Sequence, residues 1–261
     1  MSSSMTRFQD MHVNQDNMHL IHVAQDDMKQ VTIHSTASSV VEGDSDPFTL
    51  YTLIVTCPAT KTWWIIKKRY SQFYKLRQYL AKMRKACKSK TLDAILQPLM
   101  KMVFPKKSIR LDTQAMVAER KAAFDNLTAT LMAIRSECVF ASIQHQGNEE
   151  LVLQLAHACD VIEVFLQVPD LQKKEEVRHT SMVLTSPEMT ALRASFNEPH
   201  SDDDAVDEND CPICLCDLDT DEKVLHMGCG HSFHEACVMQ WLELKMSCPL
   251  CRQTSICGVN K

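Results

Sequence analysis

The sequence predicts an α+β protein with a second, small module near its C-terminal end. Three consecutive segments rich in β-branched and aromatic residues lie before residue 71, and apolar residues at helical spacing follow them. Eight of the 12 cysteines fall between Cys211 and Cys257. We therefore expect a three-stranded antiparallel meander with a helical subdomain, then an acidic linker, then a compact Cys/His-rich module.

The three strands are expected at residues 31–41, 48–57 and 61–70. The first is rich in Val, Ile, Thr and Ser and ends at a Gly- and Pro-containing turn at 43–47. The second alternates and is rich in β-branched and aromatic residues, and Pro58 opens the short turn before the third. Strands joined by such short turns predict a β-meander.

Helices are expected after residue 70, where the spacing of apolar residues changes. Ser71 is a suitable N-cap. The apolar face that follows is formed by Phe73, Leu76, Leu80 and Met83. A loop containing Pro98 and Pro105 comes next, then a helix from near Asp112 and a third amphipathic helix at 150–168.

The net charge of −5 is unevenly distributed along the chain. Residues 61–110 carry 15 Lys or Arg against one acid, Asp93, so this segment suits an anionic partner. Residues 198–210 carry seven acids and no base, which predicts a solvated linker. The expected organisation is a polar N-terminal tail at 1–27, a mixed domain at 28–170, an acidic flexible linker at 171–209, the Cys/His module at 210–255 and a tail at 256–261.

The beginning of the chain lacks the features of a secretory signal, and no run approaches the roughly 20 apolar residues of a membrane span. We therefore expect a cytoplasmic protein with reduced thiols, in which clustered cysteines indicate metal rather than disulfides.

The Cys/His module has the ligand spacing of a double zinc site. The candidate ligands are Cys211, Cys214, Cys229, His231, His234, Cys237, Cys248 and Cys251. Eight such ligands suffice for two tetrahedral zinc ions, and a module of about 45 residues is too small for an apolar core alone to stabilise it. Buried thiols without metal, and a catalytic role for Cys216, are weaker alternatives. Cys216, Cys257 and His226 fall outside the ligand pattern.

The segments CPIC, CGHSFHEAC, WL and CPLCR resemble the RING finger of the two-histidine kind. The resemblance implies a cross-brace, in which ligand pairs alternate between the two ions. One zinc would be bound by Cys211, Cys214, His234 and Cys237. The other would be bound by Cys229, His231, Cys248 and Cys251.

The RING resemblance also implies an activity. RING fingers recruit a ubiquitin-conjugating enzyme charged with ubiquitin and promote transfer to a substrate lysine without a covalent intermediate. Ile213, Trp241 and Pro249 match the conjugating-enzyme contacts, and Arg252 matches the residue that bridges that enzyme and ubiquitin. Trp241 as a core residue, or Arg252 as an ordinary surface residue, are the alternatives.

The segments KKRYSQFYKL, FPKKS and AERKAAF resemble the PX domain, a phosphoinositide-binding fold. The resemblance implies that Arg69 binds the 3-phosphate and that Tyr70 lies under the inositol ring. It assigns the 1-phosphate to Lys107, with Lys106 as the substitute, and the ring hydroxyls to Arg120. Arg120 also lies on an otherwise apolar helical face, where a charge needs a partner unless it extends to solvent.

Together the two resemblances imply a membrane-recruited RING-type ubiquitin ligase, peripheral on endosomal membranes, with phosphatidylinositol 3-phosphate as the default lipid and an unidentified protein substrate. The alternative function is a non-enzymatic sorting adaptor that uses the zinc module as a scaffold. A first domain that binds protein instead of lipid is also open, whereas a nucleic-acid partner is not expected.

Overall fold

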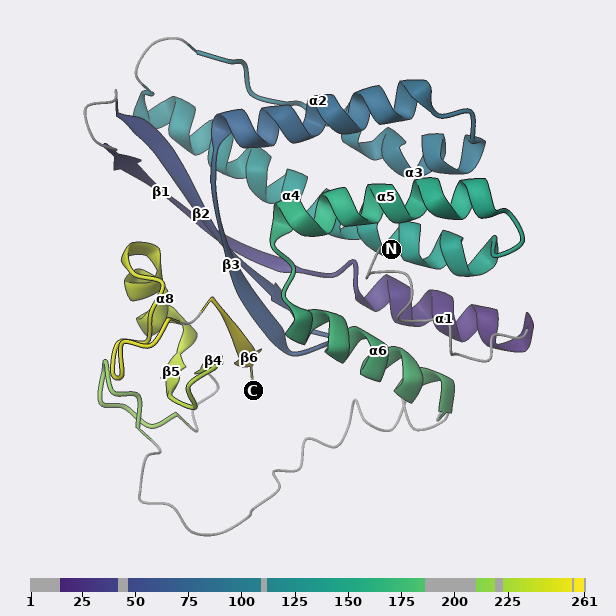
Figure 1. Ribbon diagram of the computed structural model, residues 1–261. Coiled ribbons are helices and arrows are strands. Elements are labelled where there is room, and N and C mark those ends of the chain that lie inside the picture. Colours follow the sequence, from purple (N-terminus) through teal and green to yellow (C-terminus); the bar gives the residue numbers. More distant parts are fainter. Residues whose placement is uncertain are drawn as a thin grey trace.

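The structure is a computed structural model that describes residues 15–41, 47–108, 112–185, 210–218, 223–254 and 256–260. Its first three strands are β1 (Thr32–Val40), β2 (Phe48–Cys57) and β3 (Thr62–Arg69). They pair as an antiparallel meander, with Thr36 opposite Thr52 and Leu53 opposite Ile66. The predicted α+β fold with its three-stranded meander is confirmed (Figure 1).

Four helices cover one face of this meander (Figure 1). They are α2 (Tyr70–Ala86), α3 (Lys90–Lys101), α4 (Gln114–Gln144) and α5 (Glu149–Leu166). The core between helices and sheet includes Leu53, Trp64, Phe73, Phe124, Leu131 and Ile162, all essentially inaccessible to solvent. Burial of these apolar side chains holds the helices on the sheet.

Two local predictions in this region were wrong. Pro98, expected in a loop, lies inside α3, because Leu92, Leu96 and Leu99 form a buried face that outweighs one missing backbone hydrogen bond. Helix α2 begins at Tyr70 rather than after Ser71. The N-cap is Arg69, whose backbone N–H donates to Oε1 of Gln72 at 2.8 Å.

The first domain extends beyond the predicted 28–170 at both ends. Helix α1 (Gln15–Asp27) occupies part of the expected tail, and α6 (Asp170–Thr185) occupies part of the expected linker. The two helices pack together, and Asp27 lies 2.9 Å from Nε2 of His179. The sequence hides α6 because its buried side chains are largely polar, which apolar periodicity cannot detect.

A buried ion network explains those polar side chains. The Arg135 guanidinium donates to Glu163 at 2.9 Å and to Glu176 at 2.6 and 2.8 Å. Gln172 of α6 accepts hydrogen bonds from Thr60 and Thr62, at the start of β3. Helix α6 is thereby joined to α4, α5 and the sheet. The rest of the predicted acidic linker, 186–209, lies outside the described residues.

The C-terminal module consists of β4 (Val224–Met227), β5 (Ser232–His234), α8 (Glu235–Leu244) and β6 (Cys257–Asn260). Strand β6 pairs with β3 on one side and with β4 on the other. The described strands thus form one sheet in the order β1-β2-β3-β6-β4-β5. Residues 257–260 of the expected tail instead form the strand that joins the two modules.

The module packs on the face of the meander opposite the helices (Figure 1). The shared core includes Ile54, Trp63 and Ile65 from the meander. From the module it includes Leu225, Met227, Phe233, Val238, Met239 and Leu242. Gly258 permits this approach, because a Cβ there would clash with the His226 carbonyl and lie 2.8 Å from Nε1 of Trp63. In the described part of the chain, no helix has the length and apolar character needed to cross a membrane.

Candidate metal centre and basic pocket

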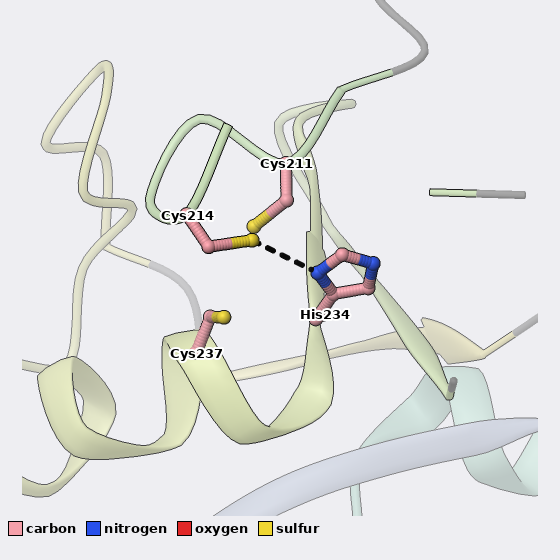
Figure 2. A group of neighbouring side chains, drawn as sticks. All are labelled: Cys211, Cys214, His234 and Cys237. Carbon is pink, nitrogen blue, oxygen red and sulfur yellow. Dashed lines mark hydrogen bonds between the residues drawn. The ribbon is translucent and has the colours of Figure 1, made fainter. Parts of the chain in front are cut away.

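The first ligand tetrad contains Cys211, Cys214, His234 and Cys237. Their ligand atoms lie within 4.8 Å of one another, and the side chains converge from a loop, the end of β5 and the first turn of α8 (Figure 2). Tetrahedral zinc with bonds of about 2.3 Å to sulfur requires ligands about 3.8 Å apart, so small adjustments suffice to bind it.

The contacts of its two ring nitrogens fix the orientation of the His234 imidazole. Nδ1 lies 3.3 Å from Sγ of Cys214, facing the tetrad. Nε2 lies 3.1 Å from the Asp217 carbonyl, which accepts its proton. A histidine that donates through one nitrogen presents the lone pair of the other to a metal, which is the usual arrangement of a zinc-bound imidazole.

The second tetrad contains Cys229, His231, Cys248 and Cys251, again within 4.8 Å. Gly230, with φ of 90°, turns the chain sharply between Cys229 and His231, so that both reach the same point. Nδ1 of His231 lies 3.3 Å from Sγ of Cys229 and 3.6 Å from Sγ of Cys248. The structure thus brings the eight predicted ligands together in the two groups that the RING resemblance implies.

The two Cys-x-x-Cys turns have the same backbone geometry. Leu215 donates its N–H to the Cys211 carbonyl at 2.8 Å, and Arg252 donates to the Cys248 carbonyl at 3.0 Å. Both donors have left-handed backbone, with φ of 60° and 59°. This repeated turn aims the two thiols of each pair in one direction.

The surroundings separate the pKa values of the thiols. The backbone N–H of Cys216 lowers the pKa of Cys214 to about 6. Burial raises the pKa of Cys237 to about 12 and that of Cys248 to about 11. Closely packed thiolates repel one another, so a divalent cation allows them all to ionise together. Donor set, spacing and geometry therefore fit two zinc ions, one for each tetrad.

The three residues expected outside the ligand sets lie outside both tetrads. Cys216 donates to the Cys214 carbonyl, and His226 contacts Oγ of Ser232 at 2.6 Å. Cys257 lies on β6 at the junction with the meander.

The predicted enzyme-contact residues occupy the surface of the zinc module. Ile213 is 42% exposed, Trp241 and Pro249 are half-buried and Arg252 is exposed. Nε1 of Trp241 donates to the Ser247 carbonyl at 2.7 Å, which ties α8 to the loop before Pro249. The exposed apolar residues also include Leu215, Leu244 and Leu250, which the sequence reasoning missed. The sequence could have indicated these residues, because each of them lies within a few positions of a zinc ligand or of Trp241.

The predicted phosphate-binding residues line one open depression in the first domain. It has a volume of about 910 Å³, and Arg69, Tyr70, Lys107 and Arg120 all contribute to its wall. The Tyr70 hydroxyl donates to the Pro105 carbonyl at 2.7 Å, which fixes the loop that carries Lys107. The depression lies where β3 ends and α2 begins, so one strand-to-helix junction supplies both Arg69 and Tyr70.

The sequence reasoning missed the pocket residues that contact Arg69 and Arg120. Phe48 lies under the Arg69 guanidinium, 4.1 Å from its ring centre. Asp112 lies 2.5 Å from Nη1 of Arg120, whose guanidinium is also 4.3 Å from the centre of the Tyr70 ring. Burial opposes the charge of Arg120, but contacts with Tyr51 and Asp112 outweigh it and raise the Arg120 pKa. The position of Arg120 on an apolar helical face predicted that its charge has a partner, and the structure identifies Asp112 as that partner.

Comparison with known families gives one match in the first domain and one match in the zinc module. Residues 58–136 match the PX domain, and residues 209–252 match the family described as Ring finger domain. No solved structure gives a significant match.

Curated relatives match the zinc module. The E3 ubiquitin-protein ligase RNF181 of Mus musculus is 48% identical over 42 residues, which is 16% of this chain and 26% of that protein. RNF126 of Homo sapiens, also an E3 ubiquitin-protein ligase, is 43% identical over 51 residues, 20% of this chain and 16% of that protein. SIRP1 of Oryza sativa, with the same description, is 48% identical over 42 residues, 16% of this chain and 13% of that protein. The chain thus spans between 13% and 26% of the length of these three relatives. It contains a PX domain followed by a RING finger of the two-histidine type.

Proposed function

We propose that this chain is a membrane-recruited ubiquitin ligase of the RING type. The observation that carries the proposal is the assembly of all eight ligands into two tetrads in a module that also carries the exposed Ile213 and Arg252 and the half-buried Trp241 and Pro249. The relatives that match this module are described as E3 ubiquitin-protein ligases. The conjugating enzyme would dock on this surface, and the substrate would be a protein lysine.

In this proposal the module acts by orientation. Zinc would hold the ligand loops rigid, so that Ile213 and Pro249 present apolar contacts without a large entropic penalty. The planar guanidinium of Arg252 would bind carbonyl groups of conjugating enzyme and ubiquitin together. A thioester held in one conformation reacts faster with an amine because fewer orientations are unproductive.

Replacing Arg252 is the sharpest test of this mechanism. Loss of a charge-assisted hydrogen bond worth about 1.5–3 kcal/mol should slow ubiquitin discharge onto free lysine by about 10- to 150-fold in Arg252→Ala. The affinity for the conjugating enzyme without bound ubiquitin should change little. Arg252→Lys is the matched control for charge and for the left-handed backbone, and zinc content is measured in each variant. Wild type and Arg252→Ala with equal background transfer would favour the adaptor function instead.

We further propose that the basic pocket recruits the protein to phosphoinositide membranes, with phosphatidylinositol 3-phosphate as the expected lipid and endosomes as the location. Support comes from the depression that Arg69, Lys107 and Arg120 line together with Tyr70, where the Arg120 guanidinium lies over the Tyr70 ring. The surrounding segment, 61–110, adds its excess of basic residues, each worth about 1 kcal/mol near an anionic surface.

Arg69→Ala should weaken binding to phosphatidylinositol 3-phosphate vesicles by about tenfold or more, because a phosphate loses a charge-assisted contact worth about 1.5–3 kcal/mol. Vesicle co-sedimentation measures the change. Lys75→Ala, which removes an exposed charge from α2, is the control for net charge. If Arg69→Ala and Lys75→Ala bind as wild type does, the pocket recognises something other than this lipid.

A further inference from the structure

The basic pocket contains an acid that a simple anion-binding site would not need. Asp112 lies among its lining residues, between β2 and the start of α4. Its Oδ1 accepts from Nη1 of Arg120 at 2.5 Å, and its Oδ2 accepts from the Thr49 hydroxyl at 2.7 Å. Both carboxylate oxygens are therefore held in place by neighbouring side chains.

The partner of this acid is the most deeply buried cation of the pocket. The side chain of Arg120 is 5% exposed, and that of Asp112 is 18% exposed. One edge of the guanidinium faces Asp112, and one face of it lies on the Tyr70 ring at 4.3 Å. The Arg120 charge is balanced in place, so this side of the pocket is close to neutral while still offering a hydrogen-bond donor and an acceptor.

Such a neutral donor and acceptor pair suits hydroxyl groups, which both donate and accept. It does not suit a phosphomonoester, which carries about −2 charge and only accepts. Any ring position close to Arg120 is also close to Asp112, because the two groups are hydrogen-bonded. A phosphate there would meet the negative charge of Asp112 at short range.

We propose that Asp112 restricts the pocket to inositol head groups with a single phosphomonoester, by rejecting a second one beside Arg120. This inference rests on the proposed phosphoinositide binding and assigns its selectivity to one residue. The lipid class is then defined by charge: one monoester on the ring in addition to the phosphodiester of the lipid.

The test compares vesicles of equal composition that contain either phosphatidylinositol 3-phosphate or phosphatidylinositol 3,4-bisphosphate at the same mole fraction. Wild type should prefer the first. In Asp112→Asn, which keeps the size and the hydrogen-bonding oxygen, the ratio of bisphosphate to monophosphate binding should rise by about tenfold or more, as expected for removal of one short-range repulsion.

Two variants separate the charge of Asp112 from other effects. Asp93→Asn removes an acid that pairs with Arg84 outside the pocket, so it matches the change in net charge and should leave the ratio as in wild type. Thr49→Val removes a hydrogen bond to Asp112 but keeps its carboxylate, and should retain the preference for the monophosphate. If the ratio of bisphosphate to monophosphate binding rises equally in Asp93→Asn and Asp112→Asn, the inference is overturned.

The remaining outcomes are also decisive. If wild type binds neither vesicle, the proposed lipid binding fails and this inference fails with it. If wild type binds and Asp112→Asn leaves the ratio unchanged, only the selectivity role fails. Titration of wild type with soluble glycerophosphoinositol 3-phosphate and glycerophosphoinositol 3,4-bisphosphate, which keep the phosphodiester, needs no variant to fold, and equal affinity for the two would overturn the role of Asp112.

Discussion

Cys248→Ser is expected to abolish ubiquitin transfer and to reduce bound zinc from two ions to one or none. Cys248 is a ligand of the second tetrad and is also fully buried in the core shared by the two domains. A structural zinc site contributes on the order of 10 kcal/mol of folding free energy, more than a module of this size gains from its apolar core. Serine leaves the packing volume nearly unchanged, so the loss reflects the missing thiolate.

Zinc content by mass spectrometry and autoubiquitination with a panel of conjugating enzymes measure this effect. Cys216→Ser is the matched control, because Cys216 is exposed and belongs to neither tetrad. It should retain both ions and the wild-type rate. Full activity in Cys248→Ser would show that the second tetrad is dispensable and would contradict the ligase mechanism proposed for this module.

Gly258→Ala is expected to separate the RING finger from the PX sheet while leaving both zinc ions bound. The added Cβ would overlap the His226 carbonyl and press on the Trp63 indole, so β6 could no longer lie between β3 and β4. Trp63 has no exposed surface. Exposing an aromatic side chain of roughly 150–250 Å² costs about 4–6 kcal/mol, which is a large share of the stability of a domain.

Three measurements follow the separation: a red shift of tryptophan fluorescence, a larger radius of gyration in small-angle scattering, and faster hydrogen exchange in β3. Gly147→Ala is the matched control, because a Cβ at Gly147 meets nothing within 4 Å. If scattering and exchange are the same in both variants, the joint sheet does not hold the two domains together in solution.

Gly258→Ala would also test whether the orientation of the zinc module relative to the basic pocket affects ubiquitin transfer on membranes. In the intact protein, the zinc module and the basic pocket belong to one continuous sheet, with a further contact of 3.4 Å between His34 of β1 and Glu243 of α8. A fixed orientation should favour transfer to substrates on the same membrane. We therefore expect Gly258→Ala to lose more activity on phosphoinositide vesicles than in solution.

Much of both sites could be predicted from local sequence. Ligands such as Cys211 and Cys214 lie two residues apart, and Arg69 and Tyr70 are neighbours at one strand end. Chemistry that depends on close spacing is visible in the sequence because a short turn can adopt few geometries. Asp112 was not identified as a pocket residue, because its partners Thr49 and Arg120 are brought to it by folding.

The sequence by itself determined the two domains, the meander and the set of zinc ligands, because periodicity and ligand spacing are local properties. Only the tertiary structure decided that β6 joins the domains, that α6 belongs to the first of them and that Asp112 balances Arg120. Each of these depends on contacts between residues far apart in the chain. A four-residue segment such as β6 is too short to be a stable strand by itself. It adopts strand structure because β3 and β4 lie on either side of it.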